Sequence, residues 1–291
     1  LALFGPRCDA DEARLAVIAD TSLQAHASEV DLNSGGAFAI RIKGNEHYML
    51  IKPDLAPIRG WRVESAGLFL HQDSACQLRT MGVSTVAADW VEGTGRSSQE
   101  PGGCTFTRAV WPDVHWAGPG SSFLSVALTN GNTDVYYADA QPLQDGWLEL
   151  PVAPEAVQSL LAGSSYGLCI SDEKGQTMAN NDVHSREQSA FAPYLLVRGA
   201  PAHGVAVPSV RLVRAEAWPG AAGFGTGAAR LTIVSQDAWS FDAGVRCAGD
   251  DGFRRLPRHV VPRPGGGEQT FVIADLPPEA DRRVELAPVD S

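Results

Sequence analysis

Short stretches in which apolar and polar positions alternate recur along the chain and predict β-strands. In residues 37–43 the side chains of Phe38, Ile40 and Ile42 would lie on one face of a strand, opposite Arg41 and Lys43. Turn residues separate these runs, a pattern typical of a β-sandwich or a β-barrel. Only residues 154–162 keep a helical period, and Gly163 ends this predicted helix. The other β-prone runs before residue 200 are residues 48–51, 66–70, 123–128, 166–170 and 193–197.

A second group of alternating runs predicts a separate, smaller β-domain. Residues 199–204 are rich in Gly, Pro and Ala and have no periodicity, which is typical of a domain boundary. Several short strands in so few residues suit a sandwich of the immunoglobulin or fibronectin type III kind. Three consecutive glycines at 265–267 predict a loop tip there. The runs are residues 209–214, 229–234, 239–241, 269–273 and 283–286.

Composition and charge exclude several classes of protein. The 291 residues are 44% hydrophobic, enough to bury a core and too many for a disordered chain. The net charge is −11, and the chain has no dense Lys/Arg cluster. We therefore expect neither nucleic acid nor an anionic lipid surface as a partner. No apolar run approaches the roughly 18 residues of a membrane span.

The chain start and the cysteines bear on where the protein works. The chain begins at Leu1 and not at methionine, as a chain does after loss of a signal peptide or after trimming at its edge. Its five cysteines show no Cys-x-x-Cys spacing, so a structural zinc site is not expected. Cys76 and Cys104 are the candidate disulfide pair. The alternative is that both are small buried thiols.

A series of short motifs follows one order over residues 16–198. The motifs are Ile18-Ala19-Asp20-Thr21-Ser22, Asn33-Ser34-Gly35-Gly36, Ile40-Arg41-Ile42-Lys43-Gly44, Asp89-Trp90-Val91-Glu92-Gly93-Thr94-Gly95, Trp116-Ala117-Gly118-Pro119-Gly120 and Ser185-Arg186-Glu187. This series resembles the DNRLRE domain, a family of secreted β-sandwich modules also classed with carbohydrate-binding module family 96. Two positions depart from the family pattern. Phe106 replaces a Trp, and Pro53 replaces the Phe after Lys52, so that strand should end at Pro53 or lie at an edge.

The strand pattern predicts an all-β fold with two domains, and the resemblance, which covers residues 16–198, implies a location outside the cytoplasm. We expect an N-terminal extension (1–15), a jelly-roll-like β-sandwich (16–198), a linker (199–208) and an immunoglobulin- or fibronectin-like sandwich (209–291). The location implied is extracellular, periplasmic or at the cell surface. The function implied is that of a secreted, non-catalytic carbohydrate-binding module for an acidic polysaccharide.

Two sets of side chains are candidates for contact with sugar. Exposed aromatic rings stack on the apolar faces of sugars, and the candidates are Trp90, Trp111 and Trp116. The alternative is that these rings are core anchors. Cations would bind the carboxylates of a uronate polymer. The candidates are Arg41, Lys43, Lys52 and Arg186.

The cationic residues have a structural interpretation as well. A polar strand face is usually solvated, and each ion pair on it contributes under about 1 kcal/mol to the stability of the fold. Arg186 and the neighbouring Glu187 could instead pin the closing strand to the opening one, through a fork with Asp20 or Glu64. For Glu187 we favour this structural role.

Asp20, Glu29 and Asn33 are candidate ligands of a structural calcium ion. They place several oxygen atoms within a short segment, and calcium takes six to eight oxygen ligands. Jelly-roll modules often hold one such ion. The alternative is that these groups are only solvated.

Signals for catalysis are poor, and we do not expect an enzyme. The chain has no G-x-S-x-G elbow, no H-E-x-x-H motif and no Gly-rich phosphate loop. Glu92 with Asp89 or Asp113 could be imagined as a glycosidase pair, but acidic pairs of this kind are common. The alternative function is a structural or accessory subunit of a cell-surface or envelope assembly, with protein partners and without sugar binding. Exposure of the candidate Trp rings would separate the two functions.

Overall fold

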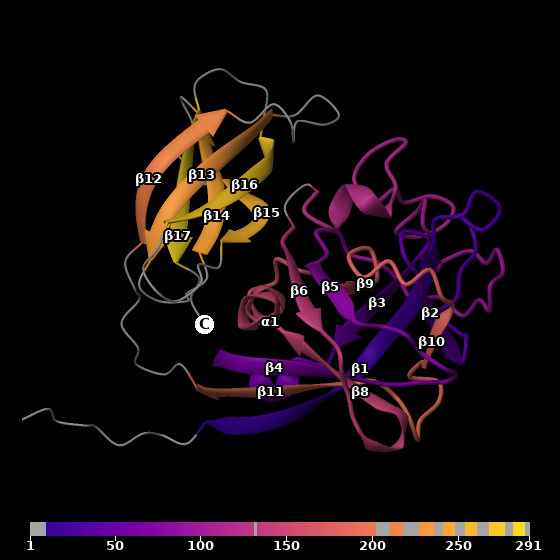
Figure 1. The fold of residues 1–291 in the computed structure, drawn as a ribbon. Helices are drawn as coiled ribbons and strands as arrows, with labels where there is room; N and C mark the ends of the chain where they lie inside the picture. Colours follow the sequence, from indigo (N-terminus) through magenta and orange to yellow (C-terminus); the bar gives the residue numbers. More distant parts are fainter. Residues whose placement is uncertain are drawn as a thin grey trace, which may run out of the picture.

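A computed structural model describes residues 10–130, 133–201, 210–217, 227–235, 241–247, 254–260, 268–276 and 282–288 (Figure 1). These residues form β-strands with one short α-helix, as the sequence predicts. The helix, α1 (Pro154–Leu161), has Pro at its first turn and lies where the helical period was found. In the described residues no helix has both the length and the apolarity to cross a membrane.

A nine-stranded antiparallel sheet, nearly closed into a barrel, forms the larger part of the fold (Figure 1). In spatial order its strands are β6 (Val135–Asp139), β5 (Thr80–Thr85), β9 (Leu168–Ser171), β3 (His47–Pro53), β1 (Asp11–Gln24), β11 (Tyr194–Pro201), β4 (Trp61–His71), β8 (Trp147–Val152) and β7 (Gln141–Pro142). A separate two-stranded sheet joins β2 (Ala39–Ile42) to β10 (Asn181–His184).

Strand β1 organises this sheet because it changes partner along its length. Its first half pairs with β11, and its second half pairs with β3. The pairing with β3 is irregular between Val17 and Ala19, which is a β-bulge position. Asp20, Ser22 and Gln24 follow this bulge on alternate positions and therefore point to one face of the strand.

Two apolar clusters fill the fold, one on each side of β3. Met49 and Ile51 pack in one cluster, and Tyr48 and Leu50 pack in the other. A strand buried on both faces reads as a continuous apolar run and not as an alternating one. The second cluster draws most of its members from the long segment between β5 and β6: Val86, Trp90, Cys104, Phe106, Ala109, Trp116, Phe123, Val126 and Ala127.

Two details of the strand prediction are wrong. Phe38 was placed on one face with Ile40 and Ile42, but it precedes β2 and is 49% exposed while they are fully buried. Residues 123–128 do not form a strand. Phe123–Val126 is a 3-10 helix, η2, because Phe123 and Val126, three positions apart, both turn into the core. The expected strand end at Pro53 is confirmed.

The C-terminal strands form two three-stranded sheets. One has the order β12 (Val210–Ala217), β13 (Gly227–Ser235) and β16 (Glu268–Leu276). The other has the order β15 (Arg254–Val260), β14 (Phe241–Cys247) and β17 (Arg282–Pro288). The predicted glycine tip at 265–267 lies outside the described residues. Strand β11 continues to Pro201, so the predicted linker begins within a strand, and the domain limits stay predictions.

Candidate functional site

A polar groove opens where β1, β2, β3 and β10 come together. Its cavity volume is about 230 Å³. Alternate residues of β1 and of β2 reach it, since every second side chain of a strand points to the same face. The lining residues are Ser22, Gln24, Glu29, Leu32, Ser34, Ala37, Ala39, Arg41, His47, Ser97 and Asp182.

A fork between Arg41 and Asp182 forms one wall of the groove. The two residues face each other in the register of β2 and β10. Arg41 Nε donates to Asp182 Oδ1 at 2.8 Å, and Nη2 donates to Oδ2 at 3.0 Å. The Arg41 side chain is 40% exposed, so the outer side of the fork is open to a ligand.

Gln24 and His47 bring unused hydrogen-bonding capacity to the groove. Gln24 Nε2 donates to Ser34 Oγ at 2.8 Å, whereas Gln24 Oε1 has no partner among the described residues. His47 Nδ1 also has no hydrogen-bond partner among the described residues. Burial lowers the pKa of His47, so its imidazole is neutral at pH 7. Both side chains are at least nine-tenths buried, which makes an unpaired polar atom costly unless a ligand or water completes it.

Phe38, an exposed aromatic residue, is the chain neighbour of two residues that line the groove. Phe38 lies between the lining residues Ala37 and Ala39 in the chain, and it is 49% exposed. The guanidinium carbon of Arg96 lies 4.6 Å from the centre of the Phe38 ring. Arg96 Nε also donates to the backbone oxygen of Gly36 at 2.9 Å. Phe38 itself is not a lining residue of the groove.

The four predicted cations do not share one site. Arg41 alone among them lines the groove. Lys43 pairs with Glu46 at 2.6 Å, and Lys52 pairs with Asp89 at 2.7 Å. Lys52 lines a different hollow, which also includes the exposed Ile18 and Tyr166.

Two of the three predicted aromatic contacts are core anchors. Trp90 is 2% exposed and Trp116 is 3% exposed. The indole of Trp90 donates to the backbone oxygen of Tyr166 at 2.9 Å, and that of Trp116 donates to the oxygen of Thr105 at 3.0 Å. Neither ring offers a face to a sugar, so this part of the prediction is corrected. Trp111 is partly buried and does not line the groove.

The predicted calcium ligands Asp20, Glu29 and Asn33 are not assembled into one site. Glu29 lines the groove. The amide of Asn33 is fully buried and fully used: Nδ2 donates to the backbone oxygens of Glu92 and Cys104, at 2.7 and 2.9 Å. Asn33 Oδ1 accepts the N–H of Gly95 at 2.7 Å. Asn33 therefore holds a loop together and has no oxygen free for an ion.

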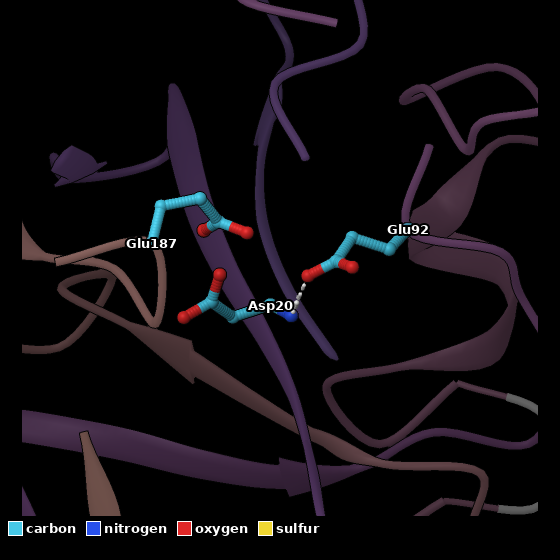
Figure 2. A group of neighbouring side chains, drawn as sticks. All are labelled: Asp20, Glu92 and Glu187. Atoms are coloured by element: carbon cyan, nitrogen blue, oxygen red, sulfur yellow. Dashed lines mark hydrogen bonds between the residues drawn. The ribbon is translucent and has the colours of Figure 1, made fainter. Parts of the chain in front are cut away.

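A different carboxylate group, Asp20, Glu92 and Glu187, could hold a metal ion. Figure 2 shows the three side chains converging from β1, from the segment after β5 and from the connection between β10 and β11. One carboxylate oxygen from each residue lies within 4.8 Å of the others. The backbone N–H of Asp20 donates to Glu92 Oε1 at 2.6 Å.

Arg186 binds this group from one side. Its Nε and Nη2 donate to the two oxygens of Glu92 at 2.7 and 2.5 Å, and its backbone N–H donates to Asp20 Oδ2 at 2.8 Å. The structural fork proposed for Arg186 is thus present, with Glu92 as its partner in place of Asp20 or Glu64. Burial raises the pKa of Asp20 to about 8, because the charged form is poorly solvated there.

Cys76 and Cys104 are free thiols in the structure. Cys104 is fully buried in the second apolar cluster, whereas Cys76 packs against the first. The predicted disulfide between them is therefore corrected to its alternative, two thiols packed in the core. Burial raises the pKa of both thiols, which lowers the fraction present as the reactive thiolate.

Sequence reasoning missed the groove as a site. Gln24, His47 and Asp182 come from three different strands, and no local motif connects them. The carboxylate group did leave a signal. Asp20, Glu92 and Glu187 each lie in one of the motifs that resemble the DNRLRE family.

Comparison with known proteins identifies no family. No family model matches the sequence, and no curated protein matches it. Among solved structures, the chain is similar to a GH2 beta-galacturonidase from Eisenbergiella tayi bound to glycerol, with 8% identity and a TM-score of 0.19. The same enzyme bound to galacturonate gives 10% identity and a TM-score of 0.18. Each alignment covers 98% of this chain and 42% of the enzyme chain, and scores this low support no statement about fold or function.

Proposed function

We propose that the chain is a non-catalytic polysaccharide-binding module and that the groove beside Arg41 is its site. The observation that supports this is the groove lining. It combines hydroxyl, amide, imidazole, guanidinium and carboxylate groups around a small concave space. Gln24 Oε1 and His47 Nδ1 have no partner within the described residues. Sugar hydroxyls both donate and accept hydrogen bonds, so they can complete such groups.

The groove and its rim suit the two kinds of surface on a sugar ring. The Arg41–Asp182 fork presents donors and acceptors side by side, which fits two neighbouring hydroxyls. Phe38 offers the apolar contact that the C–H face of a pyranose needs. The size of the groove suits one or two sugar units, with the rest of a polymer lying outside it.

The charge of the lining favours a neutral polysaccharide over a uronate polymer. Glu29 and Asp182 are acidic, Arg41 is basic, and burial lowers the pKa of His47. A uronate would have to compete with Asp182 for the Arg41 guanidinium. We therefore propose a neutral glycan as the ligand, although the family resemblance implies an acidic one.

The family resemblance over residues 16–198 and the strand pattern after residue 208 support a finer description of the fold. We propose a jelly-roll-like module over residues 16–198 and an immunoglobulin-like sandwich over residues 209–291, exported to the cell surface or beyond. In this proposal the module anchors an attached enzyme or assembly to the polysaccharide. Repeated modules would then raise the overall affinity through avidity.

Affinity electrophoresis and calorimetry on neutral and acidic polysaccharides test the proposed site. We expect Arg41→Ala to weaken binding about 10- to 100-fold, because a hydrogen bond to a charged group contributes about 1.5–3 kcal/mol. Lys43→Ala is the matched control, since Lys43 follows the same strand but pairs with Glu46 outside the groove. We expect it to bind as the unaltered chain does.

Equal loss in both variants would contradict the groove and would favour a broad cationic surface. If the unaltered chain binds none of the polysaccharides, the second function, a structural subunit, is favoured. One observation favours that function: most of the predicted sugar contacts are used inside the protein. Trp90 and Trp116 are buried, and Lys43, Lys52 and Arg186 each pair with a carboxylate.

A further inference from the structure

The group formed by Asp20, Glu92 and Glu187, when fully ionised, carries more negative charge than its contacts neutralise. Three carboxylates meet there, and Arg186 is the one cationic side chain seen to contact them in the described part of the chain. Fully ionised, the group and Arg186 carry two excess negative charges. Asp20 is 1% exposed, and Glu92 and Glu187 have side chains 12% and 19% exposed, so solvent compensates little of this charge.

A cluster of acids is not by itself a binding site, and here a second observation points to a ligand. Asp20 Oδ2 accepts the N–H of Arg186, but Asp20 Oδ1 has no partner among the described residues. The same is true of Glu187 Oε2. Both atoms are buried, and Figure 2 shows the carboxylates of Asp20 and Glu187 next to each other, on one side of Glu92.

The spacing of the oxygens fits one ion. Calcium–oxygen distances are about 2.3–2.6 Å, so two ligands on opposite sides of an ion lie about 5 Å apart. One carboxylate oxygen from each of the three residues lies within 4.8 Å of the others. The donors are all oxygens, with no thiolate or imidazole, and such a set selects hard cations over zinc or copper.

We propose that Asp20, Glu92 and Glu187 bind one divalent, oxygen-preferring cation, with calcium as the ion that fits them best. Its two positive charges cancel the two excess negative charges, and its bonds complete Asp20 Oδ1 and Glu187 Oε2. Arg186 keeps its fork with Glu92 and holds that carboxylate in position. Water completes the coordination shell, since calcium accepts six to eight oxygens.

The ion would tie three distant segments together. Asp20 belongs to β1, Glu92 to the long segment that supplies the second apolar cluster, and Glu187 to the connection that leads into β11. None of the three lines the polysaccharide groove. The role of the ion is therefore to stabilise the fold, independently of the proposed sugar site.

Calorimetric titration of the full chain with CaCl2, after treatment with a chelator, tests this site. We expect one ion per chain, and at a free concentration of 100 times the Kd the unfolding constant should fall about 100-fold. Asp20→Asn removes the charge without changing the shape. We expect it to abolish the titration signal and the effect of calcium on thermal unfolding, and Glu187→Gln should do the same.

The stability of Asp20→Asn relative to the unaltered chain, measured with and without calcium, separates an ion ligand from a merely structural residue. In chelator, Asp20→Asn should be about as stable as the unaltered chain, because asparagine keeps the shape of the side chain. In calcium it should be the less stable of the two. Glu29→Gln is the matched control, because Glu29 was also a candidate ligand but lies outside the group. We expect it to keep the full calcium response.

Three results would overturn the proposal. The first is no binding of calcium or magnesium, which would leave a proton shared by Asp20 and Glu187 as the compensating charge. The second is an unchanged calcium response in Asp20→Asn and Glu187→Gln. The third is loss of the response in Glu29→Gln. Polysaccharide binding by the chelator-treated chain is a separate readout, so failure of one proposal leaves the other standing.

Discussion

Asn33→Ala is expected to lower the free energy of unfolding by about 3–5 kcal/mol. The side chain is fully buried, donates to two backbone oxygens and accepts from the N–H of Gly95. Alanine would leave these groups without partners, and each buried unsatisfied group costs about 1–3 kcal/mol. The expected loss of stability is smaller than the largest sum of these three costs, because the loop would relax and admit water.

The surroundings of Asn33 leave little room for a substitute. A Cβ placed on Gly93 would lie 2.6 Å from Asn33 Oδ1, and one placed on Gly103 would lie 2.5 Å from Asn33 Nδ2. The backbone therefore packs directly against the amide. Asn33→Asp keeps the shape but turns a donor into an acceptor facing two carbonyl oxygens. We expect it to be destabilising as well.

Urea unfolding followed by circular dichroism measures this effect. Asn45→Ala is the matched control, because Asn45 is exposed and follows β2 on the surface. Its effect should stay within about 0.5 kcal/mol. A loss below about 1 kcal/mol for Asn33→Ala would show that the loop is held by other contacts.

Trp90→Ala is expected to cost about 3–5 kcal/mol of stability, the usual range for removing a large buried aromatic side chain. Trp90 is 2% exposed and packs in the second apolar cluster. Its indole N–H also donates to the backbone oxygen of Tyr166, which would lose its partner. Trp111→Ala is the matched control. Trp111 is only partly buried, so the loss should be smaller.

A second substitution at Trp90 separates a packing role from a sugar-binding role. Trp90→Phe keeps most of the buried surface, and we expect it to fold and to bind polysaccharide as the unaltered chain does. Thermal unfolding and affinity electrophoresis give the two readouts. A folded Trp90→Phe that no longer binds polysaccharide would restore the sugar-contact interpretation of Trp90 and contradict its role as a core anchor.

Local periodicity predicted the elements whose packing is simple. The alternation around Ile40 and Ile42 predicted β2, and the helical spacing at 154–162 predicted α1. The strand prediction failed where the apolar composition favours a strand but the spacing of the buried residues is helical. Residues 123–128 are apolar enough for a strand, but Phe123 and Val126 reach the core from one helical turn.

The sequence predicted individual site residues but not the residues that they bind. Arg41, Asp20 and Arg186 were all candidates, yet their partners lie far away in the chain. Arg41 binds Asp182, 141 residues away, and Arg186 binds Glu92, 94 residues away. No motif connects positions so distant, and the long aromatic-rich segment gave no sign that its Trp rings point inward.

The sequence by itself determined that this is an acidic, β-rich chain with a short helix at residues 154–162, because charge, composition and residue period are local properties. Only the tertiary structure decided which side chains meet. The change of partner along β1 and the antiparallel pairing of β2 with β10 set the groove. The packing of the segment after β5 brings Glu92 to Asp20 and Glu187. Those meetings depend on burial and strand register over the whole fold, and a one-residue shift of register would turn every such side chain to the opposite face.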